Sequence, residues 1–156
     1  MKKFIFVLTV ISFSLSFGLE SCKKDAVSPS ANAMDNEILT LINNHRKSLS
    51  LTELQYNEII FQQALIHSTN MANGTTAFGH DGFETRIANI KTSLGGGSSA
   101  GENVAMGYTS AQAVVDGWLN SPGHKANIEG NYNLTGISSY KKADGAYYFT
   151  QIFLKK

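Results

Sequence analysis

The chain has one cysteine, two prolines and one tryptophan in 156 residues, and these scarcities exclude several protein classes. A single cysteine cannot form a disulfide within the chain, so a small disulfide-stapled fold is excluded. Basic and acidic residues are nearly balanced, at 13 and 12, and no basic run exceeds the two residues of Lys23-Lys24. The electrostatic footprint of a nucleic-acid-binding protein is therefore missing, and no nucleic-acid partner is expected.

Long apolar runs are also scarce, and the one that stands out covers residues 4–19, directly after the positively charged Met1-Lys2-Lys3. It is too short and too rich in serine for a membrane span, and it is typical of a secretory signal. The run ends at Leu19-Glu20-Ser21-Cys22. Because the only cysteine directly follows the signal, we expect lipoprotein processing, with acyl chains on Cys22 anchoring the protein to a membrane.

The processing site departs from the usual lipoprotein pattern at Glu20, where a small residue is common, so a plain signal peptide with an incidental cysteine is the alternative. We expect a signal peptide over residues 1–21, a flexible tether over 22–33 and one domain over 34–156. The leader holds two of the basic residues and one of the acidic ones, which leaves the mature chain formally neutral. The expected location is the cell envelope, facing the periplasm or the exterior.

Hydrophobic periodicity predicts helices over residues 35–47, 51–71, 84–91 and 110–118, the last with Ser110 as N-cap. Strands are expected over residues 103–108, 134–141 and 146–154, with an Asp-Gly turn joining the last two. This order favours an α+β fold with a central antiparallel sheet. His45 and His67 lie on apolar helix faces, where a histidine is usually a packed residue that bonds to backbone.

Three polar residues each follow a glycine, and they are the candidate site: His80, Glu102 and His124. Two imidazoles and a carboxylate could hold a divalent metal such as zinc, with His80 and His124 as ligands. They could also act as general base and acid without a metal. Alternatively, Glu102 forms a salt bridge within the fold and the histidines bond to backbone. The helix before Ser121-Pro122-Gly123 should stop there, which would place His124 on a tight turn facing Glu102.

Two motifs carry a family resemblance: Gly-Glu-Asn-Val-Ala at residues 101–105 and Trp-x-x-Ser-Pro-Gly-His-x-x-Asn-Ile at residues 118–128. Together they resemble the bacterial branch of the CAP superfamily, also called SCP-like or cysteine-rich secretory protein domains. Upstream, His80-Asp81-Gly82-Phe83 with Arg86 is similar to that family's first-histidine segment. The resemblance covers about residues 36–153, nearly the whole mature chain.

The resemblance implies a three-layer α-β-α sandwich with a cleft lined by two histidines and two acids. His80, His124 and Glu102 match three of these four, and Ser121 stands where the second acid of the eukaryotic pattern would be. It also implies lipids, sterols or cell-wall material as ligand classes. We therefore expect a lipid-anchored extracytoplasmic binding module. The alternatives are a hydrolase that uses His80, Glu102 and His124, with or without a metal, and a structural domain with a vestigial cleft.

Overall fold

The computed structural model describes Met1 and residues 31–156. The predicted leader beyond Met1, the predicted lipidation site Cys22 and residues 22–30 of the predicted tether lie outside the described residues. The helices and strands follow one another in this order: α1 (Ala33–Ser48), β1 (Gln55–Tyr56), α2 (Glu58–Asn73), α3 (Phe83–Leu94), β2 (Ala100–Met106), α4 (Ala111–Leu119), α5 (Pro122–Ile128), β3 (Leu134–Lys141) and β4 (Tyr147–Leu154).

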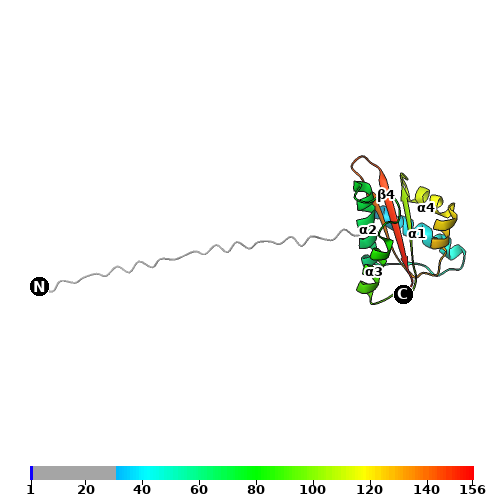
Figure 1. The fold of residues 1–156 in the computed structure, drawn as a ribbon, viewed down its shortest axis with the longest axis horizontal. Helices are drawn as coiled ribbons and strands as arrows, with labels where there is room; N and C mark the ends of the chain where they lie inside the picture. Colours follow the sequence, from blue (N-terminus) through cyan, green and yellow to red (C-terminus); the bar gives the residue numbers. More distant parts are fainter. Residues whose placement is uncertain (2–30) are drawn as a thin grey trace.

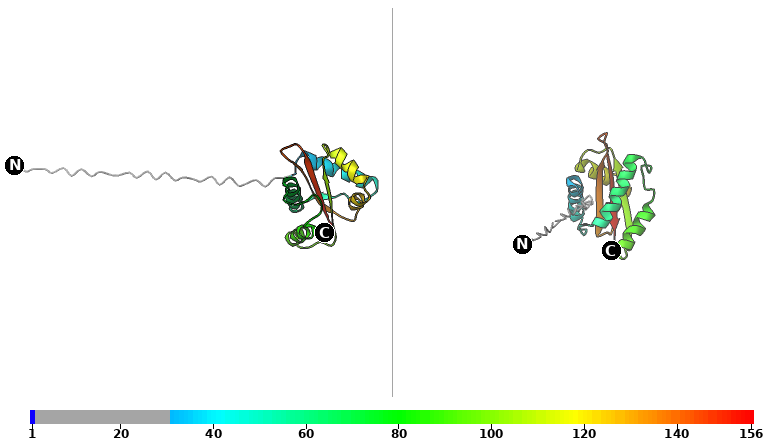
Figure 2. Two further views of the ribbon diagram at one scale, coloured as in Figure 1. Left: turned by 45° about the horizontal axis from the view of Figure 1, so that its top comes forward. Right: turned by 90° about the vertical axis from the view of Figure 1, so that its left-hand side faces the viewer.

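The four strands form one sheet in the order β1-β3-β4-β2. Strand β4 pairs antiparallel with both β2 and β3, whereas the two-residue β1 pairs parallel with β3. Helices α2 and α3 cover one face of the sheet, and α1, α4 and α5 cover the other (Figure 1 and Figure 2). The predicted α+β class and the three-layer sandwich are confirmed; the sheet is antiparallel through its three long strands.

Each face of the sheet has its own hydrophobic core, because successive strand residues point to opposite faces. Phe149 and Phe153 of β4 pack with α1 and α4, where Trp118 is also fully buried. Ile152 and Leu154 of the same strand pack with α2 and α3. The sheet is therefore buried on both faces, and the candidate site residues have to lie near its edge or at the ends of the helices.

The predicted helix over residues 51–71 begins too early. The helix α2 starts at Glu58, and Gln55–Tyr56 before it forms the strand β1. The reason is a local cap: the Asn57 side chain accepts a hydrogen bond from the Ile60 backbone N–H, and this satisfies a donor at the helix start. The apolar spacing upstream of Asn57 was mistaken for helical periodicity.

The prediction that His124 follows a tight turn is wrong. Helix α4 does end at Leu119, but a second helix, α5, begins directly at Pro122 and contains His124. A proline is favoured at the first position of a helix, because it lacks an N–H that would be unpaired there and its φ angle is already helical. The dipeptide Pro122-Gly123 therefore starts a helix as well as ending one.

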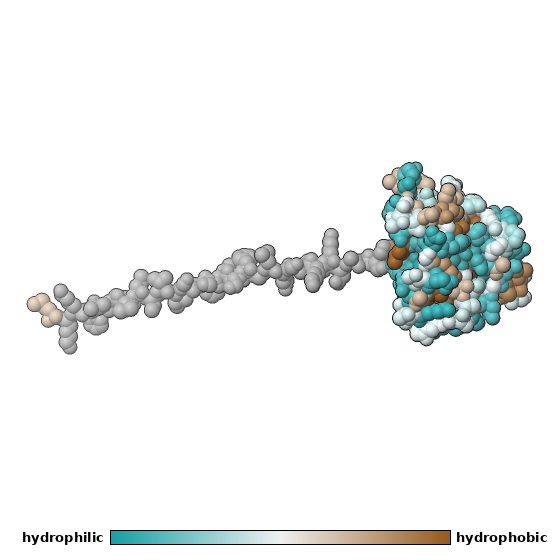
Figure 3. Space-filling model, viewed as in Figure 1, coloured by the Kyte–Doolittle hydropathy of each residue, from teal (hydrophilic) through white to brown (hydrophobic). Residues whose placement is uncertain are grey.

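The surface of the domain is mostly hydrophilic in the orientation of Figure 3, and its apolar colouring is divided into separate patches. Over the described residues, none of the helices combines the length and the hydrophobicity needed to cross a bilayer.

Candidate functional site

The centre of the candidate site is the carboxylate of Glu102 in β2, which is buried and accepts hydrogen bonds from two side chains. Arg86 of α3 binds it with two parallel hydrogen bonds, from Nε to Oε2 at 2.9 Å and from Nη2 to Oε1 at 2.8 Å. His80 Nδ1 lies 3.0 Å from Oε1. Because an arginine-bound carboxylate accepts hydrogen bonds and donates none, the proton of this contact belongs to His80 Nδ1. The lone pair of the imidazole is then on Nε2.

Arg86 also fixes the loop that carries His80. Its Nη1 donates to the Asp81 carbonyl at 2.7 Å, and its Nη2 approaches the His80 carbonyl at 3.5 Å. The side chain of Arg86 is 9% exposed and that of Glu102 is 2% exposed, whereas that of His80 is 53% exposed. The buried ion pair thus holds an accessible imidazole in one place and in one tautomer.

His80 and His124 line one cleft, which we name the β2 cleft, with a volume of about 440 Å³. It lies between the loop before α3, the C-terminal half of β2, and the helices α4 and α5. Its walls are mostly apolar, and its polar groups are the two imidazoles, the Ser121 hydroxyl and the Tyr108 hydroxyl. Its lining residues are Phe78, Gly79, His80, Val104, Ala105, Met106, Tyr108, Gly117, Trp118, Ser121 and His124.

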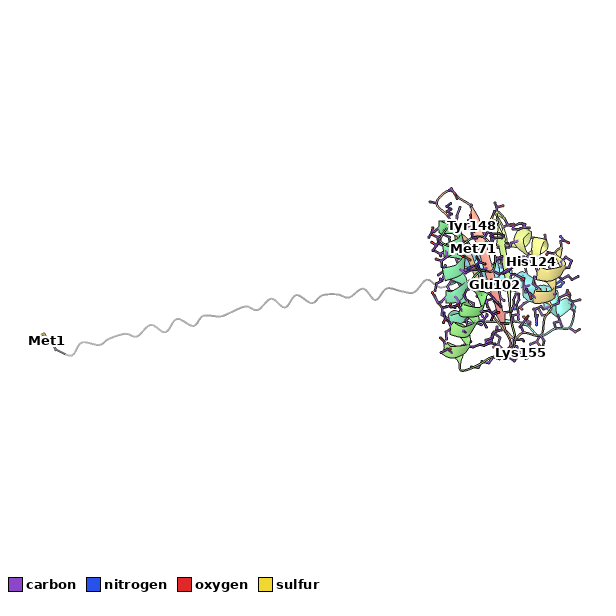
Figure 4. The ribbon with its side chains drawn as sticks, in the orientation of Figure 1. Met1, Met71, Glu102, His124, Tyr148 and Lys155 are labelled. Atoms are coloured by element: carbon purple, nitrogen blue, oxygen red, sulfur yellow. The ribbon has the colours of Figure 1, made fainter. Side chains whose placement is uncertain are left out.

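The helix α5 is fixed against β2 by two asparagines, and this positions His124. Asn103 Nδ2 donates to the His124 carbonyl at 3.2 Å. Asn127 Nδ2 donates to the Glu102 carbonyl at 3.1 Å and to Asn103 Oδ1 at 2.9 Å. Figure 4 labels Glu102 on the central sheet and His124 toward the layer of α4 and α5. His80 therefore reaches the β2 cleft from the loop before α3, and His124 reaches it from α5.

Tyr108 and Gly117 form the wall of the cleft beside α4. A side chain on Gly117 would collide with the Tyr108 hydroxyl, so only glycine lets the tyrosine ring lie against the helix. Two large apolar side chains stand at the rim: Phe78 is 49% exposed and Met106 is 52% exposed. The cleft thus continues into an apolar surface.

Glu102 does not line the β2 cleft, although the sequence predicts it in one cleft with the two histidines. It lines a smaller depression with His80, Phe83, Ala100 and Gly101. Ser121 does line the cleft, and as the N-cap residue of α5 it makes no side-chain cap bond, so its hydroxyl is available to a ligand. The structure therefore groups His80, Ser121 and His124, with Glu102 behind His80.

The other two histidines have structural contacts. His67 is buried in α2, and its Nε2 lies 2.8 Å from the Gly79 carbonyl, which confirms the expected packed residue bonded to backbone. His45 is half-buried and contacts the carboxylate of Glu129 at 2.9 Å, so its partner is a side chain instead.

Stability should decrease on mild acidification, because two histidines are harder to protonate in the folded chain. Burial lowers the pKa of His67 and, together with the charge of His80, that of His124 below the ordinary 6.5. Protonation then favours the unfolded chain, so the free energy of unfolding is highest above pH 6.5 and falls as the pH drops below it. Urea unfolding from about pH 7.5 down to about pH 5.5 measures this slope across the histidine range.

The control is the double variant His67→Gln/His124→Gln, whose slope over the same range should be flatter. A free energy of unfolding that rises on acidification in the wild type, or an unchanged slope in the double variant, would contradict the assignment to these two histidines.

The side chains that face the β2 cleft provide fewer strong ligands than a resident zinc ion needs. Both oxygens of Glu102 already accept from Arg86, and one also contacts His80, which leaves two imidazoles and the Ser121 hydroxyl facing the cleft. Zinc sites in proteins use at least three strong protein ligands. Among Met1 and residues 31–156, no group of three or more histidine, cysteine, aspartate or glutamate side chains is arranged to hold a metal ion.

Sequence reasoning missed the role of Arg86 and the apolar part of the cleft. In the sequence, Arg86 stands out only as part of a motif. Its position on a short helix, next to Ile87 and four residues before Ile90, both of which are buried, was a usable signal that the arginine is buried too. Tyr108, Phe78 and Met106 carry no signal in one sequence, because nothing local distinguishes a rim residue from any exposed apolar residue.

Comparison with known proteins gives consistent matches. The family model described as "CAP: Cysteine-rich secretory protein family" matches residues 39–153. Two Bacillus subtilis proteins are similar in sequence: the uncharacterised membrane protein YlbC, 32% identical over 127 residues, and the uncharacterised protein YkwD, 30% identical over 129 residues. The matches cover 78% and 81% of this chain but only 34% and 49% of the relatives. The chain thus spans a third to a half of the length of these curated relatives.

Solved structures agree with the sequence matches. An outer surface protein of Borrelia burgdorferi superposes with a TM-score of 0.71 at 25% identity, covering 81% of this chain and 96% of that one. An extracellular SCP-domain protein of Bacillus anthracis gives a TM-score of 0.67 at 28% identity, covering 83% and 45%. A venom allergen-like protein of Schistosoma mansoni shares the fold with a TM-score of 0.61 at 14% identity, covering 80% and 90%.

Proposed function

This chain belongs to the cysteine-rich secretory protein (CAP) family, and from that membership we propose that it is an extracytoplasmic binding module whose β2 cleft takes a small amphiphilic ligand. The ligand class is a lipid or a cell-wall-related molecule with an apolar part and a hydrogen-bonding head. The relatives described as extracellular, outer-surface and membrane proteins support a location outside the cytoplasm.

One observation carries this proposal: the cleft joins a polar end to an apolar end. At the polar end, His80, Ser121 and His124 present two imidazoles and a hydroxyl. At the other end, Phe78 and Met106 expose about half of their surface to solvent. A volume of about 440 Å³ lies within the range of small-molecule sites. An acyl chain on the apolar rim, with its head group between the imidazoles, would use both ends.

Removing the apolar rim should weaken ligand binding without harming the fold. The test is the double variant Phe78→Ser/Met106→Ser. Because both side chains are already half exposed in the wild type, the free energy of unfolding should change little. Each of the two side chains removed should contribute about 1 kcal/mol or more of binding free energy through its apolar contact with the ligand. We therefore expect the affinity for a fluorescent fatty acid to fall about tenfold to a hundredfold. Fluorescence titration of the unlipidated domain from Asp25 onward measures it.

The matched control is Leu49→Ser at the end of α1, which removes an apolar side chain of similar exposure, 48%, that does not line the cleft. Its affinity should equal that of the wild type. A second variant, His80→Ala/His124→Ala, tests the polar end with the same probe. Equal binding by the rim variant, the histidine variant and the wild type would place the ligand elsewhere and would refute the proposal.

The proposal includes an anchor at Cys22, which lies outside the described residues. We expect the wild type, expressed in full, to be recovered with membranes and to incorporate an alkyne-labelled fatty acid. Cys22→Ser should lose the label and leave the membrane fraction, because no other cysteine can take its place. If Cys22→Ser stays labelled and membrane-bound, the anchor is not at this residue.

A hydrolase is the second candidate, favoured by the contact between His80 Nδ1 and Glu102 at 3.0 Å. With its Nδ1 proton held by Glu102, the accessible Nε2 of His80 could accept a proton from water, and His124 could assist the leaving group. Glu102 would then position His80, and no step requires a metal. His80→Gln should abolish turnover on lipid and cell-wall ester or amide substrates. If the turnover survives in that variant, the hydrolase interpretation fails.

A further inference from the structure

A second cavity lies on the other side of the loop that carries His80. This cavity, which we name the helical pocket, has a volume of about 390 Å³ and is formed by α2, α3 and the loop between them. Gly79 and His80 line the β2 cleft, whereas Asp81 and Gly82 line the helical pocket. The buried pair of Arg86 and Glu102 separates the two spaces. The function proposed above uses only the β2 cleft.

Half of the ten residues that line the helical pocket have neutral hydrogen-bonding side chains whose capacity is unused. Three carboxamides and two hydroxyls belong to this set: Gln63, Asn70, Thr76, Thr85 and Asn89. Within the described part of the chain, none of the five makes a side-chain hydrogen bond. Each of these groups both donates and accepts. The pocket therefore offers a ligand many hydrogen bonds at no cost to the fold.

The charges around the helical pocket favour a neutral ligand. Arg86 is 7% exposed at its floor, but its positive charge is already matched by the two bonds to Glu102. At the edge, Asp81 adds an exposed carboxylate that would repel a phosphate or a carboxylate. One N–H of the Arg86 Nη1 atom is used by the Asp81 carbonyl, and within the described residues the other has no recorded partner. The floor thus adds a donor but no net positive charge.

From these features we infer that the helical pocket binds a neutral saccharide unit. Neighbouring hydroxyls on a sugar ring each donate and accept, and a carboxamide can pair with two of them at once. An apolar side chain for the C–H face of a ring is also present, because Ile66 lies in the lining and is 50% exposed. A free ion or a fatty acid would engage only a few of these amides and hydroxyls, whereas a sugar ring presents a hydroxyl to several of them at once.

Titration of the isotopically labelled domain with neutral sugars, followed by NMR, tests the inference. The probes are glucose, N-acetylglucosamine and the β-1,4-linked dimer of the latter. We expect saturable shifts of backbone amides in residues 63–70 and 81–89. Asn70→Ala and Asn89→Ala should each weaken binding about threefold to tenfold, as expected for one lost hydrogen bond. Thr92→Ala, on the exposed side of α3 outside the pocket, is the matched control and should leave binding unchanged.

Three outcomes would overturn the inference: no saturable shift with any of the three sugars, shifts confined to residues of the β2 cleft, or equal affinity in the Asn70 and Asn89 variants and the wild type. The result is separable from the proposed function. Asn89→Ala should keep its fatty-acid affinity, and Phe78→Ser/Met106→Ser should keep its sugar affinity. A failure in one cavity therefore leaves the test of the other intact.

Discussion

Replacing Gly136 with alanine is expected to destabilise the domain by about 3 kcal/mol or more and to lower its melting temperature by about 10 °C or more. Gly136 lies in β3, directly under α2. An added Cβ would lie 2.5 Å from the Ile60 carbonyl carbon and 2.6 Å from Phe61 Cα, and it would be closer still to the Phe61 backbone nitrogen. All three atoms belong to the helix backbone, so no side-chain rotation can relieve the overlap. The helix has to move away from the sheet.

The matched control is Gly123→Ala, at the start of α5. No atom lies within 4 Å of a Cβ at this position, and its φ angle is not positive. Alanine is better than glycine in a helix, so this variant should be neutral or more stable by up to about 1 kcal/mol. Thermal unfolding of both variants gives the comparison. Equal melting temperatures for the two would mean that α2 does not pack on β3 as closely as the structure places it.

Gly136 also shows what a single sequence does and does not predict. Alternation of apolar and small residues correctly predicted the strand over residues 134–141, because strand periodicity is a local property. The need for glycine at this position comes from α2, which is about seventy residues earlier in the chain. No local pattern encodes that close approach.

The motifs of the site had the same limit. The motif residues correctly identified the family and the three-layer fold, because the identity and spacing of motif residues can be read directly from one sequence. Their geometry was harder: Pro122 was interpreted as the end of a helix, and it also begins the next one, which moves His124 from a turn into α5. Local chemistry allowed both roles for the proline. Only the packing of α5 against β2, through Asn103 and Asn127, decides between them.

Buried cations were the largest omission. Arg46 is 1% exposed in α1, and it donates to the carbonyls of Thr52, Ile128, Gly130 and Tyr132. Arginine is mostly exposed in proteins, so sequence reasoning treats it as a surface residue unless a partner is known. The partners here are backbone carbonyls, and three of the four lie more than eighty residues away, at the end of α5 and in the loop after it. Arg86 is the second such case, and it has consequences for the chemistry of the site.

Arg86→Met is expected to destabilise the domain by about 3–5 kcal/mol, which is the usual result of leaving one charge of a buried pair without its partner. Glu102 would keep only the contact with His80 and the more distant His67, at 3.9 Å. The loop carbonyls of His80 and Asp81 would lose their donor as well. Urea unfolding at neutral pH measures the loss. Lys47→Met is the control, because its pair with Glu53 is half exposed on both sides and should contribute less than about 1 kcal/mol.

The variants Glu102→Gln and Arg86→Met/Glu102→Gln complete a double-mutant cycle with Arg86→Met. Because each single change leaves a charge unpaired and the double change leaves none, the double variant should lose less than the sum of the two, by more than about 1 kcal/mol. Additive losses would mean that the pair is not coupled. Arg86 would then not be what fixes the carboxylate behind His80, and the hydrolase proposal, in which Glu102 positions His80, would lose support. Strong coupling would support the role of the buried pair in holding His80, and leave the chemistry of the β2 cleft to the two imidazoles.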